Sequence, residues 1–300
     1  MDAFLVLDKP LGLSSQQAVT RARRALRADK AGHTGTLDPL ATGVLPIALG
    51  EATKIIPYLD EDIKEYRVSA LLGVATDTYD AEGRETHRAE SCHADRSDVE
   101  KALVLFLGEQ EQVPPAYSAI KKDGKPLYAY AREGQEMALK PRRVRIDSIK
   151  VEAFQFPNLT LSVRCGKGTY IRSLIHDLGI RLETWAHVTE LRRLRSGPFV
   201  ESQAIPLEFV QKDLPEIGAG LLGIEQCLRH LPQILLESEA ELLRVQSGVP
   251  LRRIKQVLEN KSYFNNPVAL VFEGMIRAIV VDSGGKDFSY GRVLHRKVGN

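Results

Sequence analysis

Cysteine is scarce in this chain, with three residues in 300, at positions 92, 165 and 227. The count is odd, the spacings are wide and no CxxC pair occurs. The sequence therefore predicts no disulfide framework and indicates a reducing compartment. Cys92 precedes His93 and lies near His87, but no second ligand pair follows at zinc spacing. No metal site is therefore predicted.

Long apolar runs are also missing. No run approaches the roughly 20 apolar residues that are needed to cross a bilayer. The N-terminal run AFLVL follows an acid at position 2, which is typical of a buried strand and not of a signal peptide. We therefore expect a cytoplasmic protein without a membrane partner.

Charge of either sign is not in excess, because 41 basic residues face 39 acidic ones and the formal net charge is +2. The distribution is more informative than the total. Basic residues cluster at 21–30, 140–150 and 192–195. Such clusters are typical of a polyanion-binding face, and equally of solvated helix and strand surfaces. Both interpretations stay open from composition alone.

Phosphate-binding signatures are absent, since neither GxxxxGK[ST] nor GxGxxG occurs. What the chain has instead is the stretch GHTGTLDPLATGVLPIALGEATK at 32–54, with Asp38 between Leu37 and Pro39. An acid inside a tight, apolar, glycine-punctuated loop indicates a reaction centre. The alternative is that Asp38 caps a helix whose first residue is Pro39.

Four further residues could face the same cleft. Tyr170 and Arg172 begin a predicted helix directly after a glycine-bearing strand end, so they could point into a cleft together. Equally, Tyr170 could pack in the core while Arg172 forms a surface ion pair. Tyr66 lies on a predicted strand, where an aromatic is usually a core residue. His33 is either a turn residue or a wedge that fills the gap left by a displaced base.

The order of predicted elements indicates an α+β fold with a mixed or antiparallel central sheet. The stretches 142–156 and 159–168 are expected to pair as antiparallel strands around Pro157-Asn158, and 169–182 to form a helix. The pattern changes near Pro232. We therefore expect a catalytic domain at 1–232 and a small β-rich domain at 233–300.

Six stretches, taken in order, resemble the bacterial TruB family of tRNA pseudouridine-55 synthases. The resemblance runs from about residue 3 to 200, and the C-terminal part is similar to the PUA-like RNA-binding module of that family. It implies the pseudouridine synthase α+β fold, with no cofactor and no metal. The stretches are KPLGLSS (9–15), GHTGTLDPLATGVLPIALGEATK (32–54), KEYRV (64–68), VPPAYSAIKKDGKPLYAYAREG (113–134), CGKGTYIRSLIHDLG (165–179) and HVTELRRLRSGPF (187–199).

The resemblance also implies a role for individual residues. Asp38 would be the catalytic carboxylate, and Arg172 would pair with it. The other implied positions are Tyr66, which would stack on the target base, Tyr170 and Leu191, which would contact the substrate, His33, which would fill the space vacated in the RNA loop, and Lys9 and Pro10, at the rim of the site.

The implied reaction breaks the C1′–N1 bond of uridine and forms a C1′–C5 bond in the same nucleotide, which needs no redox cofactor. The target base must first be extruded from the RNA loop. The resemblance implies a stand-alone, monomeric enzyme that acts on uridine 55 of the tRNA T stem-loop without a protein partner. Two alternatives stay open, a guide-RNA-dependent subunit of the dyskerin type and a non-catalytic RNA-folding module. Attack at C1′, attack at C6 and a glycal route are not distinguished.

Overall fold

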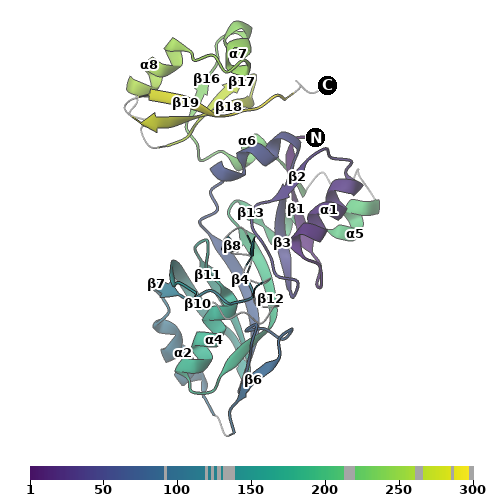
Figure 1. Cartoon of the computed structure of the whole chain (residues 1–300), viewed down its shortest axis with the longest axis vertical. Coiled ribbons are helices and arrows are strands. Elements are labelled where there is room, and N and C mark those ends of the chain that lie inside the picture. The colour runs from purple at the N-terminus through teal and green to yellow at the C-terminus, as the bar shows by residue number, and fades with distance from the viewer. Residues whose placement is uncertain are drawn as a thin grey trace.

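The computed structural model describes residues 1–90, 93–118, 121–122, 125–126, 130, 139–212, 220–260, 266–284 and 287–296. These residues form a long molecule in which a large sheet and a small sheet follow one another along the long axis (Figure 1). Within the described ranges, no helix has both the length and the apolar character that a membrane crossing requires.

The large sheet is mixed and, in the described part of the chain, contains eleven strands. These are β1 (Ala3–Lys9), β2 (Ala31–His33), β3 (Ala41–Leu49), β4 (Lys64–Leu72), β7 (Gly108–Gln112), β10 (Arg142–Gln155), β11 (Asn158–Cys165), β12 (Ala186–Ser196), β13 (Phe199–Val200), β14 (Ile205–Pro206) and β15 (Leu221–Gly223). The main order is β14-β1-β3-β12-β4-β11-β10-β7. Strand β1 is parallel to β14 and β3 is parallel to β12, while β10 and β11 form the predicted antiparallel pair. The α+β fold with a mixed sheet is thereby confirmed.

Strand β1 explains why the N-terminal apolar run is continuous. Successive side chains of a strand point to opposite faces of the sheet. Leu5 and Leu7 belong to the core on one face, and Phe4 and Val6 belong to a separate core on the other. All four are fully buried, so the apolar run is continuous because both faces of this part of the strand are covered.

Helical segments cover both faces of the large sheet: most pack on the core of Leu5 and Leu7, while 50–58 and 224–227 pack on the core of Phe4 and Val6. Helix α4 shows how, because Ile171, Leu174, Ile175 and Leu178 recur at helical spacing and are all buried against the sheet. The helices that accompany the large sheet are α1 (Ser15–Ala25), α2 (Arg96–Val104), α4 (Ile171–Arg181), α5 (Leu207–Lys212) and α6 (Ile224–Cys227), with the 3₁₀ segments η1 (Gly50–Tyr58) and η2 (Glu201–Gln203) and two short hairpins, β5 (Val74–Thr76) with β6 (Glu85–Arg88) and β8 (Lys121–Lys122) with β9 (Lys125–Pro126).

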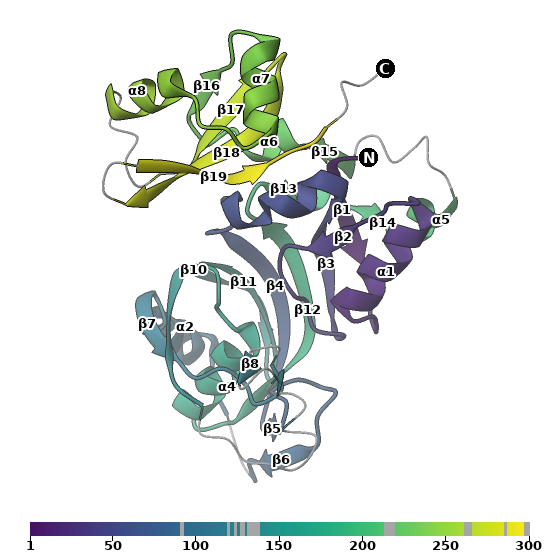
Figure 2. The same cartoon turned by 45° about the horizontal axis from the view of Figure 1, so that its top comes forward.

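The small sheet has the order β16-β17-β18-β19. Its elements are β16 (Gln233–Leu235), α7 (Glu239–Gln246), α8 (Arg252–Asn260), β17 (Val268–Phe272), β18 (Met275–Gly284) and β19 (Asp287–Val293). The turn between β17 and β18 places Glu273 and Gly274 at positive φ, as the predicted hairpin requires. Figure 2 shows α6 and β15 between the two sheets.

The two sheets share one apolar core. Phe4, Val44 and Ile55 pack in the same buried cluster as Ile276 and Ile279 of β18. The small sheet is therefore docked on the face of the large sheet that carries Phe4 and Val6. Residues from both sides of the predicted boundary at 232 contribute to this one cluster.

Truncation after residue 232 is expected to destabilise what remains, because the docked face of the large sheet loses its cover. The point variant Ile279→Ala, at a fully buried position, should lower the free energy of unfolding by about 2–4 kcal/mol. Leu243→Ala is the matched control, since this side chain is 63% exposed, and it should cost less than about 0.5 kcal/mol. Urea unfolding gives the free energy of unfolding of the truncated chain and of the two point variants, each compared with the full wild-type chain. Equal unfolding midpoints for the truncated and full chains would contradict this packing.

Candidate active site

The loop that carries Asp38 is anchored by its backbone neighbours. The buried Ser15 hydroxyl accepts a hydrogen bond from Leu37 N at 2.8 Å and donates one to Leu37 O at 2.9 Å. On the other side, Pro39 O accepts a hydrogen bond from Gly12 N at 2.9 Å. The predicted alternative, in which Asp38 caps a helix, is wrong, because this described stretch runs into strand β3.

Lys9 lies behind this loop and not at the rim. Its side chain is fully buried, and Nζ donates to Pro10 O at 2.9 Å, Leu13 O at 2.6 Å and Pro39 O at 3.3 Å. Burial lowers the pKa of Lys9 to about 8, against the opposing effect of Asp38. The ammonium therefore ties the 9–13 segment to the back of the loop that carries Asp38.

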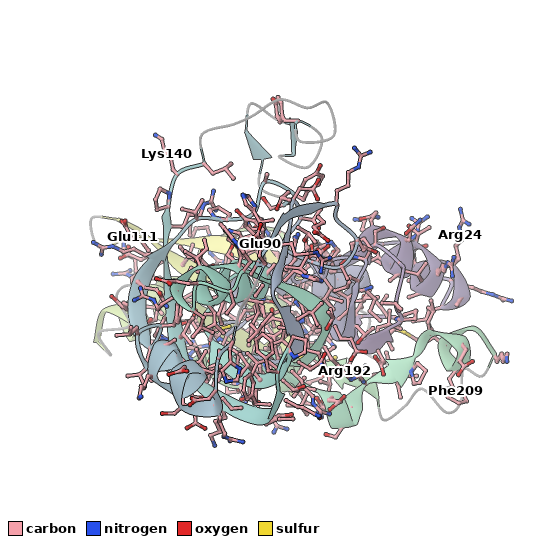
Figure 3. All side chains as sticks on the ribbon, turned by 90° about the horizontal axis from the view of Figure 1, so that it is seen from below. Arg24, Glu90, Glu111, Lys140, Arg192 and Phe209 are labelled. Atoms are coloured by element: carbon pink, nitrogen blue, oxygen red, sulfur yellow. The ribbon has the colours of Figure 1, made fainter. Side chains whose placement is uncertain are left out.

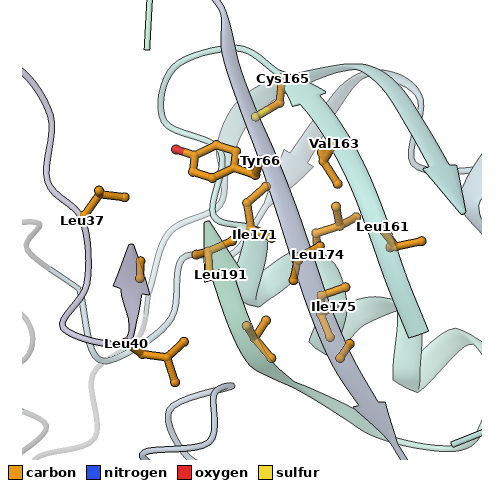
Figure 4. Close-up of a cluster of buried hydrophobic side chains, with 14 of the residues drawn as sticks. Leu37, Leu40, Tyr66, Leu161, Val163, Cys165, Ile171, Leu174, Ile175 and Leu191 are labelled. Atoms are coloured by element: carbon orange, nitrogen blue, oxygen red, sulfur yellow. The ribbon is translucent and has the colours of Figure 1, made fainter. Parts of the chain in front are cut away.

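A cavity of about 320 Å³ opens in front of Asp38. Its walls bring together Asp38, Tyr66, Tyr170, Arg172 and Leu191, which are five of the six residues predicted from the sequence. Figure 4 shows the Tyr66 ring reaching from β4 toward the loop of Leu37, above Leu191 and Ile171. Lys64 and Arg193 also line the cavity, a position that the sequence analysis did not assign to them.

Asp38 and Arg172 form the charged centre of this cavity. Arg172 Nε lies 2.9 Å from Asp38 Oδ2, and the arginine side chain is only 4% exposed while that of Asp38 is 33% exposed. Burial raises the pKa of the Asp38 carboxyl, and the Arg172 guanidinium opposes that rise. The carboxylate thus has a cation on one side and the open cavity on the other.

Arg172 is itself fixed at its other nitrogens. Nη1 lies 3.2 Å from Asp80 Oδ2 and donates to Thr78 O at 2.7 Å, while Nη2 donates to Tyr117 O at 2.8 Å. Asp80 is buried and accepts a 2.6 Å hydrogen bond from the Thr78 hydroxyl. A guanidinium bound on three sides has little freedom to leave Asp38.

Arg193 closes the cavity near Tyr66. It is 1% exposed, and its Nε donates to Val44 O at 2.7 Å. Of the two interpretations left open for the 192–195 cluster, neither a phosphate contact nor a solvated surface fits Arg193, because its side chain is buried beside the cavity and bound to backbone carbonyls. Gly43 has φ +95°, and a Cβ there would lie 2.3 Å from Arg193 O, so the close strand pairing requires glycine.

The two tyrosines of the cavity differ in how they are placed. Tyr66 is 7% exposed on β4, and burial raises the pKa of its phenol while Arg193 lowers it. Tyr170 precedes α4, where its N donates to Gln112 Oε1 at 2.8 Å and its O accepts from Gln112 Nε2 at 3.0 Å. Burial raises the pKa of Tyr170 as well, so both rings enter the cavity as neutral phenols.

Leu191 supplies an apolar wall from β12. It pairs with Ala41 on the parallel side and with Val68 on the antiparallel side, which places this strand between the loop of Asp38 and the strand of Tyr66. Because three strands converge here, residues far apart in the sequence meet at one cavity.

His33 is the predicted residue that the structure does not bring into the cavity. It ends β2, pairs with Ile47 of β3 and is absent from the described cavity lining. Burial lowers its pKa, and Arg193 lowers it further, so the imidazole is neutral at neutral pH. Its contact with the RNA loop stays a prediction.

Labelled residues of the basic stretches lie apart from one another when the molecule is seen from below (Figure 3). Arg24 of α1 and Lys140 lie on opposite flanks (Figure 3). Arg192 pairs with Asp8 at 2.9 Å and with Glu201 at 2.5 Å, so this cation is already matched by carboxylates. Among the described residues, no group of three or more His, Cys, Asp or Glu side chains could hold a metal ion.

Comparison with known proteins gives the class. Residues 23–171 match the family model described as TruB family pseudouridylate synthase, N-terminal domain, and residues 172–228 match the tRNA pseudouridylate synthase B C-terminal domain. The crystal structure of a Cbf5-Nop10-Gar1 complex is similar over 97% of this chain and 84% of that chain, with TM-score 0.70 and 26% identity. The fold is therefore of the pseudouridine synthase class.

Curated relatives then give the family. The proteins named tRNA pseudouridine synthase B from Geobacter sulfurreducens and Pseudomonas paraeruginosa are 47% and 50% identical to this chain, over 83% and 84% of both chains respectively. The protein of that name from Geotalea uraniireducens is 42% identical over 93% of this chain and 91% of its own length. The chain belongs to the TruB family. Both family models end before the small sheet begins at Gln233.

Proposed function

We propose that this chain isomerises uridine 55 in the T loop of tRNA to pseudouridine. The observation that carries the proposal is the Asp38 carboxylate, which is partly open to a cavity and lies 2.9 Å from the buried Arg172. The relatives named tRNA pseudouridine synthase B support tRNA as the substrate. The T stem-loop as the recognised element follows from the resemblance of the site motifs.

The reaction requires a charged carboxylate in a partly dry site. Asp38 can add to the nucleoside or remove a proton only when it is ionised. Burial alone would favour the protonated acid, and Arg172 counteracts this. In the net reaction the C1′–N1 bond breaks, the C1′–C5 bond forms, C5 loses its proton and N1 gains one. Atoms and electrons therefore balance without a cofactor.

The cavity is suited to one extruded nucleoside. Its volume of about 320 Å³ lies at the small end of known ligand sites. Tyr66 offers an aromatic face to the flipped base, and Leu191 and Tyr170 bound the same space. His33, outside the cavity, would fill the space that the base vacates in the RNA loop.

Tyr66→Leu is expected to lower the rate of pseudouridine formation by about tenfold or more, because stacking on one base contributes roughly 1–3 kcal/mol. Affinity for tRNA should change by less than about twofold, since phosphate contacts dominate RNA binding. Tyr66→Phe is the control, because it keeps the aromatic face and should retain most of the rate. Parallel losses of rate and affinity in Tyr66→Leu would argue against a stacking role.

We propose further that the enzyme acts alone, as a cytoplasmic monomer with no protein partner. Relatives with 42–50% identity match most of this chain, whereas the Cbf5 structure, at 26% identity, is more distant. The division into a catalytic unit at 1–232 and a PUA-like RNA-binding unit at 233–300 belongs to the same proposal, supported by the separate C-terminal sheet.

A single comparison separates the three functions under consideration. The purified chain is mixed with an unmodified T stem-loop that carries tritium at C5 of uridine, and both gel mobility and tritium release are recorded. A stand-alone synthase shifts the RNA and releases tritium. A guide-dependent subunit releases tritium only with a guide RNA and its protein partners. A folding module shifts the RNA and releases none.

A further inference from the structure

Tyr79 has an unusual backbone conformation close to the site. Its φ is +63°, in the left-handed region that bulky side chains rarely adopt. The residue lies between Thr78, whose carbonyl accepts a hydrogen bond from Arg172, and Asp80, whose carboxylate pairs with Arg172. The strained residue is thus flanked on both sides by the groups that hold the arginine. Strain that persists in a folded protein points to a role for the side chain it places.

The Tyr79 ring is stacked on His176 of α4. The ring centroids are 3.8 Å apart and the planes differ by 11°. His176 follows Arg172 by four residues, so both side chains lie on the same face of the helix. The turn formed by 78–80 is therefore tied to α4 twice, once through the charged contacts of Arg172 and once through the ring stack.

The backbone of this turn is held independently of the Tyr79 ring. Tyr79 O accepts a hydrogen bond from Val188 N at 3.0 Å, and Ala81 N donates to Val188 O at 2.9 Å. The Thr76 hydroxyl adds a 2.7 Å hydrogen bond to Asp80 O. These hydrogen bonds hold the backbone of the turn to β12 and to Thr76, and none of them involves the Tyr79 ring. The contact between Tyr79 and His176 of α4 is made by the ring.

The charge states of the pair suit an aromatic stack. Burial lowers the pKa of His176, and the nearby His87 lowers it further, so the imidazole is neutral at neutral pH. Burial raises the pKa of the Tyr79 phenol, as does Asp177, whose own pKa burial raises to about 6. In the described structure His176 Nδ1 is buried without a hydrogen-bond partner, so its contact with Tyr79 is one of packing.

We propose that Tyr79 is a positioning residue for the isomerisation. Stacked on His176, it holds the 78–80 turn against α4 and so keeps the Arg172 guanidinium directed at Asp38. Tyr79 itself is not part of the cavity lining in the described structure. The inference rests on the proposed function, because it takes Asp38 as the reacting carboxylate.

Tyr79→Gly separates this role from a backbone role, since glycine adopts positive φ without strain and the turn can keep its shape. The rate of tritium release in a single turnover, with enzyme in excess, should fall about tenfold, because small misplacements of catalytic groups are costly. RNA affinity should stay within about twofold of wild type. Tyr79→Phe keeps the ring and should keep the rate within about twofold.

His176→Ala removes the other half of the stack and should reproduce the loss. The double variant with Tyr79→Gly should be no slower than either single variant, because both changes remove the same contact. Thermal unfolding of each variant shows that the proteins compared are folded.

The pH dependence of the rate gives a readout that a general loss of stability would not move. Burial raises the pKa of Asp38, and Arg172 lowers it. If Arg172 is displaced, it lowers this pKa less, so the pKa of Asp38 should rise. The acid limb of the rate profile should therefore shift to higher pH, and the loss in Tyr79→Gly should shrink at high pH. The other charged neighbours, Asp80, Lys9 and Glu82, are unchanged in this variant.

Three results would overturn the inference: a Tyr79→Gly rate within about twofold of wild type, losses that multiply in the double variant, or the same loss at every pH. Wild-type enzyme that binds the RNA and releases no tritium would instead remove the proposed function. Active wild type with equally active variants would remove the role of Tyr79 alone.

Discussion

Asp38→Asn is expected to abolish pseudouridine formation, with a fall of at least about a thousandfold in the single-turnover rate. The amide has the shape of the carboxylate but can neither add to the nucleoside nor accept a proton effectively. Because the cavity walls and the anchored loop are unchanged, affinity for the T stem-loop should stay close to wild type. Tritium release from C5 measures the rate, and filter binding measures the affinity.

Asp62→Asn is the matched control for this change. Asp62 is 60% exposed, pairs with Lys167 at 3.3 Å and is not part of the cavity lining in the described structure. Its replacement should leave the rate within about twofold of wild type. An Asp38→Asn enzyme that converts uridine at nearly the normal rate would remove Asp38 from the mechanism.

Arg172→Met should impair both catalysis and stability. The change leaves Asp80 buried, and Asp38 partly buried, without their common cation. Removing one partner of a buried ion pair typically costs about 3–5 kcal/mol, which should appear as a lower free energy of unfolding. The rate should fall at least about a hundredfold, because Asp38 then loses the group that keeps it ionised and oriented.

The sign of the pH effect on stability follows from the direction of the shift. Burial already raises the pKa of Asp38 in the folded state, and without Arg172 it should rise further. When the pKa of a carboxyl is raised in the folded state, the folded protein loses stability as the pH increases above the ordinary pKa of that carboxyl. The destabilisation by Arg172→Met should therefore be larger at pH 8 than at pH 5.

Two controls make the Arg172 result specific. Arg172→Lys keeps the charge but cannot make three separately directed contacts, so stability should recover more than the rate. Arg164→Met removes an arginine that is 44% exposed and 3.5 Å from Glu65, and should cost less than about 1 kcal/mol. Arg172→Met with normal stability and rate would show that the ion pair is dispensable.

Much of the fold was predictable from local signals. The period of apolar residues gave α4, and the alternating runs around Pro157-Asn158 gave β10 and β11. Strand β12 could not be recognised, because its charged run RRLR hides a central strand. Only the pairing with β3 and β4 decides that Arg193 points inward.

The site was predictable where a residue type is unusual in its place. An acid in a glycine-rich apolar loop identified Asp38, whereas the Asp-Pro pair also suggested a helix cap, which is excluded because the chain continues into strand β3. Asp80 was missed, since it lies in a turn-rich stretch that is typical of a surface. It is buried beside its partner Arg172, which is distant in the sequence and adjacent only in the fold.

The central claim is that an ionised Asp38, paired with Arg172, rearranges one uridine of the T loop. The most direct measurement uses the purified chain alone and a T stem-loop tritiated at C5 of uridine 55 only. The claim predicts release of one tritium for each RNA, with pseudouridine recovered at position 55 after digestion and nucleoside chromatography. RNA that is bound by the enzyme while its tritium stays in place would contradict it.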